Sequence, residues 1–180
     1  TIFKRIGIKD ISLEINSIGC KTCRAEYKKA LVEYFSQHTD SLCETCNGRL
    51  STNPLRILDC KSPVCAAIAK DAPKITDYLC EDCGAHFEEL QGLLKAAEIQ
   101  FKINPNIVRG LDYYCGTVFE FVSTAIGAQG TVCGGGRYDG LSEELGGPAL
   151  SGLGFALGME RLILASQAEG ENAQQADSPD

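Results

Sequence analysis

The pattern of apolar and polar residues predicts strands near the start and in the second half of the chain. Ile11, Leu13 and Ile15 fall on one face of residues 10–17, and this alternation is typical of a half-buried strand. Gly19 ends the pattern. Later β-rich segments, separated by Asn-Pro-Asn and glycine signals, cover residues 99–103, 117–122 and 130–133. A glycine-rich stretch, Gly134–Gly140, follows the last of them.

Helical periodicity predicts three helices. The first covers about residues 24–38, the second about 85–98, and the third ends the segment 152–165. The second is expected to bury Phe87, Leu90, Leu93, Leu94 and Ala97. Residues 40–82 consist of short segments with little periodicity. A strand, a helical unit and then consecutive strands without regular strand–helix alternation predict an α+β fold with a mainly antiparallel sheet.

The composition is that of a globular protein. The chain has 180 residues, 44% of them hydrophobic and 23% charged, which suits one domain or a domain with a smaller insert. No apolar run approaches the roughly 18–20 residues of a membrane span, and Thr1–Ile8 lacks a secretory signal. We therefore expect no membrane partner and a cytoplasmic location. The missing initiator Met predicts a start inside a longer product. The net charge of −7 disfavours tight autonomous binding to nucleic acid.

Cysteine is far more frequent than in an average protein, with ten residues. Eight of them form closely spaced pairs: Cys20–Cys23, Cys43–Cys46, Cys60–Cys65 and Cys80–Cys83. The CxxC spacing of three pairs lets two thiolates reach one tetrahedral ion, so two pairs complete a four-cysteine zinc site. We predict structural zinc, because the weak apolar periodicity of this segment indicates a small core that a metal would stabilise. The pattern does not show which pairs combine.

Two other interpretations of the cysteines remain open. Free cysteine packs as a small apolar residue, so the pairs could be reduced core thiols. A disulfide or redox role is also open, although a redox CxxC normally opens a helix in a thioredoxin-like unit and only Cys20–Cys23 opens a predicted helix. Cys115 and Cys133 have no partner at ligand spacing and are expected to be packing residues. His38 and His86 are single helical histidines that are expected to face solvent.

The segment RGLDYY, residues 109–114, has the composition of a ligand pocket. Arg109 supplies a permanent charge, and Gly110 permits close backbone approach. Tyr113 and Tyr114 supply an apolar wall with hydroxyl groups. Such a set suits a phosphate-bearing ligand. On spacing alone, however, an arginine and buried tyrosines at a strand end are more often structural.

Three signatures of one enzyme family occur in its order: RGLDYY with TVFE (residues 109–120), GGGRYDGL (134–141) and GFALGMERL (154–162). The first two are similar to the histidine-specific segments of histidyl-tRNA synthetases, and the third resembles motif 3 of class II synthetases. INSIG and NPLRILDC extend the resemblance upstream, so that it covers residues 1–168.

The resemblance implies a role for each pocket residue. Arg109 would be the catalytic residue, because it would contact the α-phosphate of ATP and the histidine carboxylate and stabilise the charge that develops there. Tyr113, Tyr114 and Tyr138 would line the histidine pocket, and Arg161 would hold the triphosphate of ATP. The other substrate- and ATP-binding positions would be glycines that admit the ligand: Gly134, Gly135, Gly136 and Gly158.

The resemblance also implies substrates, partners and domains. Enzymes of this family use ATP with Mg to activate histidine, transfer it to tRNA(His) and act as homodimers. Residues 1–17 and 99–168 would belong to the class II catalytic sheet, residues 18–98 would form a mostly helical Cys-rich insertion domain, and residues 169–180 would be a disordered tail or linker. Class II motifs 1 and 2 and the anticodon-binding domain are not in this sequence, so the chain alone is expected to be inactive.

Two alternatives stay open beside the ligase. One is a non-catalytic paralogue, such as a regulatory subunit of histidine biosynthesis that senses histidine without charging tRNA. Such relatives tend to lack the insertion and an intact RGLDYY, and this chain has both. The other is a zinc-bearing interaction module with a vestigial pocket, against which the intact pocket residues argue.

Overall fold

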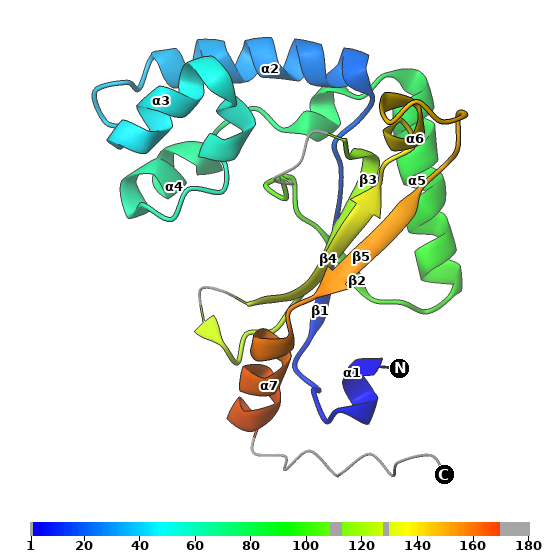
Figure 1. The fold of residues 1–180 in the computed structure, drawn as a ribbon. Helices are drawn as coiled ribbons and strands as arrows, with labels where there is room; N and C mark the ends of the chain where they lie inside the picture. The colour runs from blue at the N-terminus through cyan, green and yellow to red at the C-terminus, as the bar shows by residue number, and fades with distance from the viewer. Residues whose placement is uncertain (1, 109–112, 128–129, 170–180) are drawn as a thin grey trace.

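A five-stranded sheet with the strand order β2–β1–β3–β4–β5 forms the centre of the molecule (Figure 1). The computed structural model describes residues 2–108, 113–127 and 130–169. The strands are β1 (Ser12–Ser17), β2 (Phe101–Ile103), β3 (Cys115–Val122), β4 (Thr131–Arg137) and β5 (Leu153–Leu157). β2 pairs with β1 in parallel, and the other neighbours pair antiparallel. The predicted α+β fold with a mainly antiparallel sheet is confirmed.

The strand register gives the sheet two chemically different faces, because residues paired across strands share a face and successive pairs alternate. One face, called here the glycine face, carries the rows Glu14–Glu120–Gly134–Ala156 and Asn16–Val118–Gly136–Gly154. The opposite face carries Leu13–Phe121–Cys133–Leu157 and Ile15–Phe119–Gly135–Phe155. The small residues of the glycine face leave room above the sheet for large side chains or a ligand.

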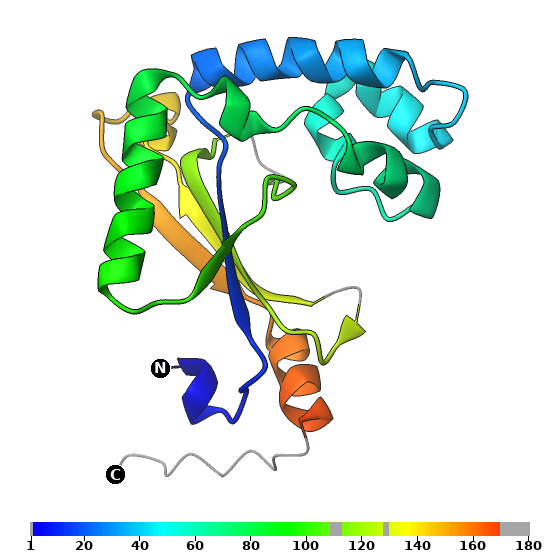
Figure 2. The same ribbon diagram turned by 180° about the vertical axis from the view of Figure 1, so that it is seen from behind.

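The chain between β1 and β2 is helical (Figures 1 and 2). Its first part forms an arm at one end of the sheet, with α2 (Lys21–Ser36), α3 (Glu44–Thr52), η1 (Pro54–Ile57), α4 (Pro63–Lys70) and η2 (Ile75–Tyr78). The last helix, α5 (Glu81–Ala96), lies beside the sheet. The arm has its own core, made of Tyr27, Leu31, Phe35, Leu42, Cys46, Ile57, Leu58, Cys65, Ala69, Ala72 and Ile75. The helices predicted at 24–38 and 85–98 are therefore confirmed, and each begins earlier than its apolar pattern.

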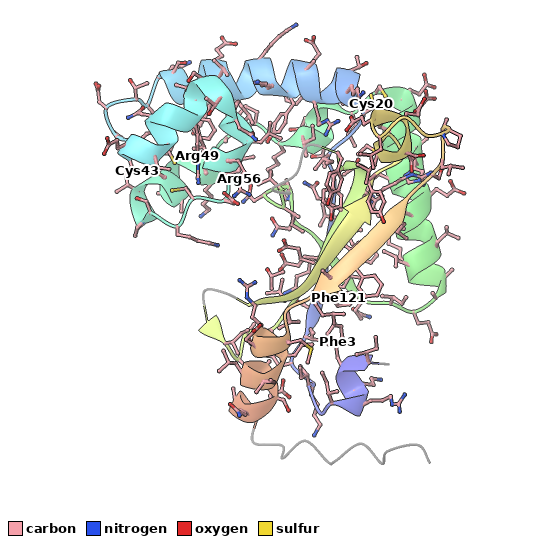
Figure 3. The ribbon with its side chains drawn as sticks, viewed as in Figure 1. Phe3, Cys20, Cys43, Arg49, Arg56 and Phe121 are labelled. Atoms are coloured by element: carbon pink, nitrogen blue, oxygen red, sulfur yellow. The ribbon has the colours of Figure 1, made fainter. Side chains whose placement is uncertain are left out.

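A second group of helices closes the other end of the sheet. The short α1 (Ile2–Arg5) and α7 (Met159–Ala168) lie close together there (Figure 1). Ile8, Val132 and Ala165 are buried between them, and the rings of Phe3 and Phe121, labelled in Figure 3, lie 5.0 Å apart. The remaining short helix, α6 (Leu141–Glu144), connects β4 with β5. Of the expected tail, only Glu169 is described, and its carboxylate accepts hydrogen bonds from the backbone N–H groups of Lys9 and Asp10.

Two sequence predictions need correction. The strand expected at 130–133 continues as β4 to Arg137, through the glycines, because their missing side chains allow β5 to approach closely: a Cβ on Gly135 would lie 2.2 Å from the carbonyl oxygen of Gly154. The predicted buried side of α5 is confirmed only in part. Phe87 is buried and Leu90 and Leu94 are half-buried. Leu93 is 62% exposed and Ala97 is exposed, because the core of the arm includes no residue of α5.

Candidate active site and metal centres

Three tyrosines from two parts of the sequence meet at one end of the glycine face. Tyr113 and Tyr114 directly precede β3, and Tyr138 directly follows β4. The ring centroids of Tyr113 and Tyr114 are 4.8 Å apart, and Tyr138 meets both rings edge-on at 5.8 and 6.0 Å. The fold thus brings together the three predicted pocket tyrosines. Arg109, the predicted catalytic residue, lies outside the described residues.

Glycines create the space that the tyrosines occupy. A Cβ on Gly136 would lie 3.0 Å from Cδ1 of Tyr114 and 2.8 Å from the carbonyl oxygen of Thr117. A Cβ on Gly154 would lie 2.5 Å from the hydroxyl of Tyr138. Both rings therefore rest on bare backbone, which only glycine permits. Gly135, a predicted substrate-binding residue, lies on the opposite face of the sheet from Gly134 and Gly136.

Charged residues on both sides of Tyr138 fix the end of β4. Nε of Arg137 lies 2.6 Å from Oδ2 of Asp139, and Oδ1 of Asp139 accepts a hydrogen bond of 3.1 Å from the backbone N–H of Gly152. The backbone N–H of Tyr138 donates to the carbonyl of Gly152 at 2.9 Å. These contacts hold Tyr138 against the start of β5. Arg137 and Asp139 were not among the predicted site residues, although both lie inside GGGRYDGL.

A hollow of about 390 Å³ lies between β4, β5 and the start of α7. Three predicted ATP- and substrate-binding residues line it: Gly134, Gly158 and Arg161. Nη1 of Arg161 donates to the carbonyl of Thr131 at 2.7 Å, which places its charge at the edge of the hollow. The N-terminus of α7 borders the hollow, and the free backbone N–H groups of a helix N-terminus favour an anion. Glu120 lines it too and was missed from the sequence, although the alternation of TVFE places Glu120 on the same face as Val118.

The eight paired cysteines form two compact groups. The junction cluster consists of Cys20, Cys23, Cys80 and Cys83, and the distal cluster consists of Cys43, Cys46, Cys60 and Cys65. Within each cluster the four Sγ atoms all lie within 4.8 Å of one another. The fold therefore answers what the spacing could not: the first CxxC combines with the last, and the second combines with the Cx4C pair.

The sulfur positions suit a tetrahedral metal ion. Four thiolates with Zn–S bonds of about 2.3 Å have sulfurs about 3.8 Å apart. The Sγ atoms of Cys20 and Cys23 are 3.5 Å apart, and those of Cys43 and Cys60 are 3.9 Å apart. Backbone N–H groups also face the sulfurs: Cys80 donates to Sγ of Cys23 at 3.1 Å, and Cys43 donates to Sγ of Cys65 at 3.3 Å. Such donors stabilise thiolates.

Each cluster holds thiols of unequal acidity. The backbone N–H of Cys23 faces the Cys20 sulfur and lowers the pKa of that thiol to about 6. In the distal cluster the backbone N–H of Cys46 lowers the pKa of Cys43 to about 7. Burial raises the pKa of Cys83 to about 12 and also raises the pKa of Cys46. At neutral pH each cluster is therefore expected to hold a thiolate beside a protonated thiol when no cation is bound, and a divalent ion would displace the remaining protons.

The single cysteines and histidines have different surroundings. Cys133 is buried within β4, as expected of a packing residue, whereas Cys115 is half-buried and lines a hollow of about 250 Å³ together with Cys20 and Cys83. His86 is exposed as expected, and its Nε2 lies 3.5 Å from Nη1 of Arg137. His38 differs from the expectation: it follows α2, is half-buried and packs on Tyr34 with ring centroids 5.0 Å apart.

Comparison with known proteins identifies the family. The family model described as histidyl-tRNA synthetase matches residues 63–162, more than half of the chain. The chain belongs to the histidyl-tRNA synthetase family. Over 180 residues it is 51% identical to the histidine–tRNA ligase of Caldanaerobacter subterraneus subsp. tengcongensis, and over 178 residues it is 55% identical to that of Acetivibrio thermocellus. The matched part is 100% and 99% of this chain, but 43% of each relative.

A solved histidyl-tRNA synthetase has the same fold. The apo enzyme of S. aureus is 42% identical, with a TM-score of 0.69 over 95% of this chain and 42% of that one. The chain thus spans less than half the length of the histidyl-tRNA synthetases that it matches. Within the described part of the chain, no helix has the length and apolar character to cross a membrane.

Proposed function

We propose that this chain supplies the histidine- and ATP-binding surface of a cytoplasmic histidine–tRNA ligase, which activates histidine with ATP and transfers it to tRNA(His). The observation that carries the proposal is the arrangement on the glycine face. The tyrosines of both histidine-specific segments meet at one end of it, and the hollow with Arg161 lies farther along the same strands. An amino acid and a nucleotide could therefore lie side by side on one sheet.

Each residue has a task that its chemistry suits. The rings of Tyr113, Tyr114 and Tyr138 would enclose the imidazole, and their hydroxyls would bond its nitrogens. Arg109 would stabilise the charge that develops as the histidine carboxylate attacks the α-phosphorus. Arg161 and the N-terminus of α7 would bind the triphosphate. ATP would arrive with Mg, which neutralises phosphate charge.

The remaining partners follow from the same proposal. Residues 18–98 would form the insertion domain that closes over the acceptor stem of tRNA(His), while residues 1–17 and 99–168 would complete the catalytic sheet. The ligase would be a homodimer. The sequences of motifs 1 and 2 would provide the dimer contacts and a further ATP-binding arginine, so the 180 residues alone should not form the adenylate.

The two cysteine clusters would each bind one structural zinc ion. The proposal is supported by the eight sulfurs, which converge in two groups of four at spacings that suit a tetrathiolate ion. Elemental analysis of the chain, purified without chelator, should find about two zinc equivalents. Reduced core thiols, the alternative, would leave the preparation nearly metal-free while all eight thiols react with a thiol reagent after unfolding.

A chimera tests the ligase activity. The 180 residues would replace the matching segment of the Acetivibrio thermocellus ligase, to which they are 55% identical. We expect histidine-dependent ATP–pyrophosphate exchange by the chimera and none by the isolated chain. The matched control carries Tyr114→Phe, which keeps the buried ring but removes the hydroxyl and should raise KM for histidine in the exchange. A folded chimera that binds histidine but does not exchange pyrophosphate would favour the non-catalytic paralogue, and one that binds neither substrate would favour the interaction module.

A further inference from the structure

The junction cluster lies where the arm leaves the sheet and where it returns. Cys20 and Cys23 stand at the start of α2, shortly after β1 ends at Ser17. Cys80 and Cys83 stand at the start of α5, the helix beside the sheet. A metal ion bound to these four thiolates would join the two ends of the arm. The distal cluster differs, because it lies inside the arm: in Figure 3 Cys20 and Cys43 are near opposite ends of α2.

The first half of the junction cluster is hydrogen-bonded to the strand of Tyr114. The backbone N–H of Gly116 donates to the carbonyl of Gly19 at 3.0 Å, and the N–H of Ile18 donates to the carbonyl of Gly116 at 2.8 Å. Gly19 directly precedes Cys20. Arg24, which directly follows Cys23, donates from Nη1 to the carbonyl of Tyr114 at 2.6 Å.

The turn between β1 and the cysteines requires glycine. Gly19 has a φ of +62°, a left-handed conformation that favours glycine. A Cβ on Gly19 would lie 2.5 Å from Cβ of Cys23 and 3.2 Å from Cδ2 of Leu79, the residue before Cys80. Gly19 therefore lies next to both halves of the cluster, beside Cys23 of the first and beside Leu79 at the start of the second.

The second half contacts the strand that leads to Tyr138. From α5, His86 reaches Nη1 of Arg137, the residue before Tyr138, with its Nε2 at 3.5 Å. The hollow of about 250 Å³ at this place is lined by Cys20 and Cys83 of the cluster and by Arg137 of β4. Each helix that begins at the cluster therefore contacts a strand end that carries a pocket tyrosine.

We infer that zinc in the junction cluster is a positioning element of the tyrosine pocket, whereas zinc in the distal cluster stabilises the arm only. Binding of the ion would release the remaining thiol protons of the cluster to solvent and would fix the start of α2 to the start of α5. Through Gly19, Arg24 and His86 that link holds Tyr114 and Tyr138 at their spacing on the glycine face. The statement that the pocket takes histidine rests on the proposed function, but the link between metal and pocket does not.

Matched variants of the whole chain test the link. Cys80→Ser removes an exposed ligand of the junction cluster, and Cys43→Ser removes a half-buried ligand of the distal cluster. Each should lose one zinc equivalent. In Cys80→Ser we expect hydrogen exchange of the segment 113–118, which includes the Gly116 amide, to accelerate by about tenfold or more. In Cys43→Ser that segment should exchange as in the parent, while α3 and α4 exchange faster.

A third variant, Cys80→His, separates metal binding from the loss of a thiol. A set of three cysteines and one histidine also binds zinc, so this variant should recover the zinc equivalent and the slow exchange of residues 113–118. The inference is overturned if the parent binds no zinc, if Cys80→Ser leaves that segment unchanged, or if both serine variants accelerate it equally, since the last outcome indicates general destabilisation.

Kinetics of the chimeric ligase test whether the junction cluster affects histidine binding. Cys80→Ser should raise KM for histidine about tenfold with kcat within about twofold, and Cys43→Ser should change neither. A chimera without ligase activity, combined with the expected zinc content and exchange pattern, would refute the proposed function and leave the link between metal and pocket intact. If the chimera is active and Cys80→Ser leaves its KM for histidine unchanged, the positioning role is refuted.

Discussion

Nη1 of Arg24 donates a hydrogen bond to the backbone carbonyl of Tyr114, with the two atoms 2.6 Å apart. The two residues are 90 positions apart in the chain, and one belongs to the first turn of α2 while the other enters β3. A hydrogen bond from a charged donor contributes about 1.5–3 kcal/mol. This contact therefore ties the arm to the pocket, because moving α2 would also move the backbone of a pocket tyrosine.

Arg24→Met should weaken histidine binding in the chimeric ligase. Methionine keeps the apolar stem but cannot donate to the Tyr114 carbonyl, so we expect KM for histidine to rise about tenfold while kcat stays within about twofold. The measurement is ATP–pyrophosphate exchange at varied histidine concentration. Lys28→Met, on an exposed position of the same helix, is the matched control and should behave as the parent. Equal effects of both substitutions would mean that helix charge, not the contact with Tyr114, matters.

Gly136→Ala should destabilise the chain. The new methyl group would meet the Thr117 carbonyl, Cγ1 of Val118 and Cδ1 of Tyr114 at 2.8–3.0 Å, so a strand or the ring must shift. Overpacking of this kind costs about 1–3 kcal/mol, which urea unfolding monitored by circular dichroism can resolve. Gly140→Ala is the control, because nothing lies within 4 Å of its Cβ position. If Gly136→Ala were as stable as Gly140→Ala, the tyrosine would not rest on β4 as described.

The elements with a complete periodic pattern were predictable from the sequence. The face of α2 with Tyr27, Leu31 and Phe35 is buried as its spacing indicates, since this apolar stripe forms part of the core of the arm. The convergence of Tyr114 with Tyr138 followed from the family resemblance and not from periodicity. It depends on the register that places Gly136 beside Val118, and no local pattern encodes that register.

The features that were missed depend on contacts between distant residues. The pairing of Cys20–Cys23 with Cys80–Cys83 requires the path of the whole arm, which spacing alone does not contain. Arg137 and Asp139 became visible as anchors only when β5 placed Gly152 beside them. The exposure of Leu93 could not be foreseen either, because a leucine at helical spacing indicates a buried face only if another element covers it.

Tyr27→Phe should destabilise the arm at neutral pH. The buried hydroxyl of Tyr27 donates to the carbonyl of Pro73 at 2.9 Å, and phenylalanine would leave that carbonyl without this donor. The expected loss is about 1–2 kcal/mol in the free energy of unfolding, measured in urea at pH 7. Tyr78→Phe, which changes a partly buried tyrosine packed 5.5 Å away, is the control and should cost less.

The difference in unfolding free energy between the parent and Tyr27→Phe should depend on pH. Burial raises the pKa of Tyr27 above its ordinary value of 10.0, so the unfolded chain releases this proton at a lower pH than the folded chain. The stabilisation by the protonated hydroxyl is therefore complete below about pH 10 and declines above it. The difference in unfolding free energy between the parent and Tyr27→Phe should shrink between about pH 10 and 11. A constant difference across that range would show that the hydroxyl is accessible to solvent.

Arg161→Ala should impair ATP use more than histidine use. Arg161 lines the hollow with Gly134 and Gly158, and the N-terminus of α7 faces the same space, so removal of the guanidinium takes away one of two groups that attract phosphate. In the chimeric ligase we expect KM for ATP to rise about tenfold or more and KM for histidine to change by less than about threefold. Gln167→Ala, at an exposed position of α7, controls for changes in the helix. Because Arg161 also donates to the Thr131 carbonyl, the melting temperature must be measured alongside. A variant that loses stability but keeps its KM for ATP would assign Arg161 to the support of β4 and would leave the α7 N-terminus as the phosphate site.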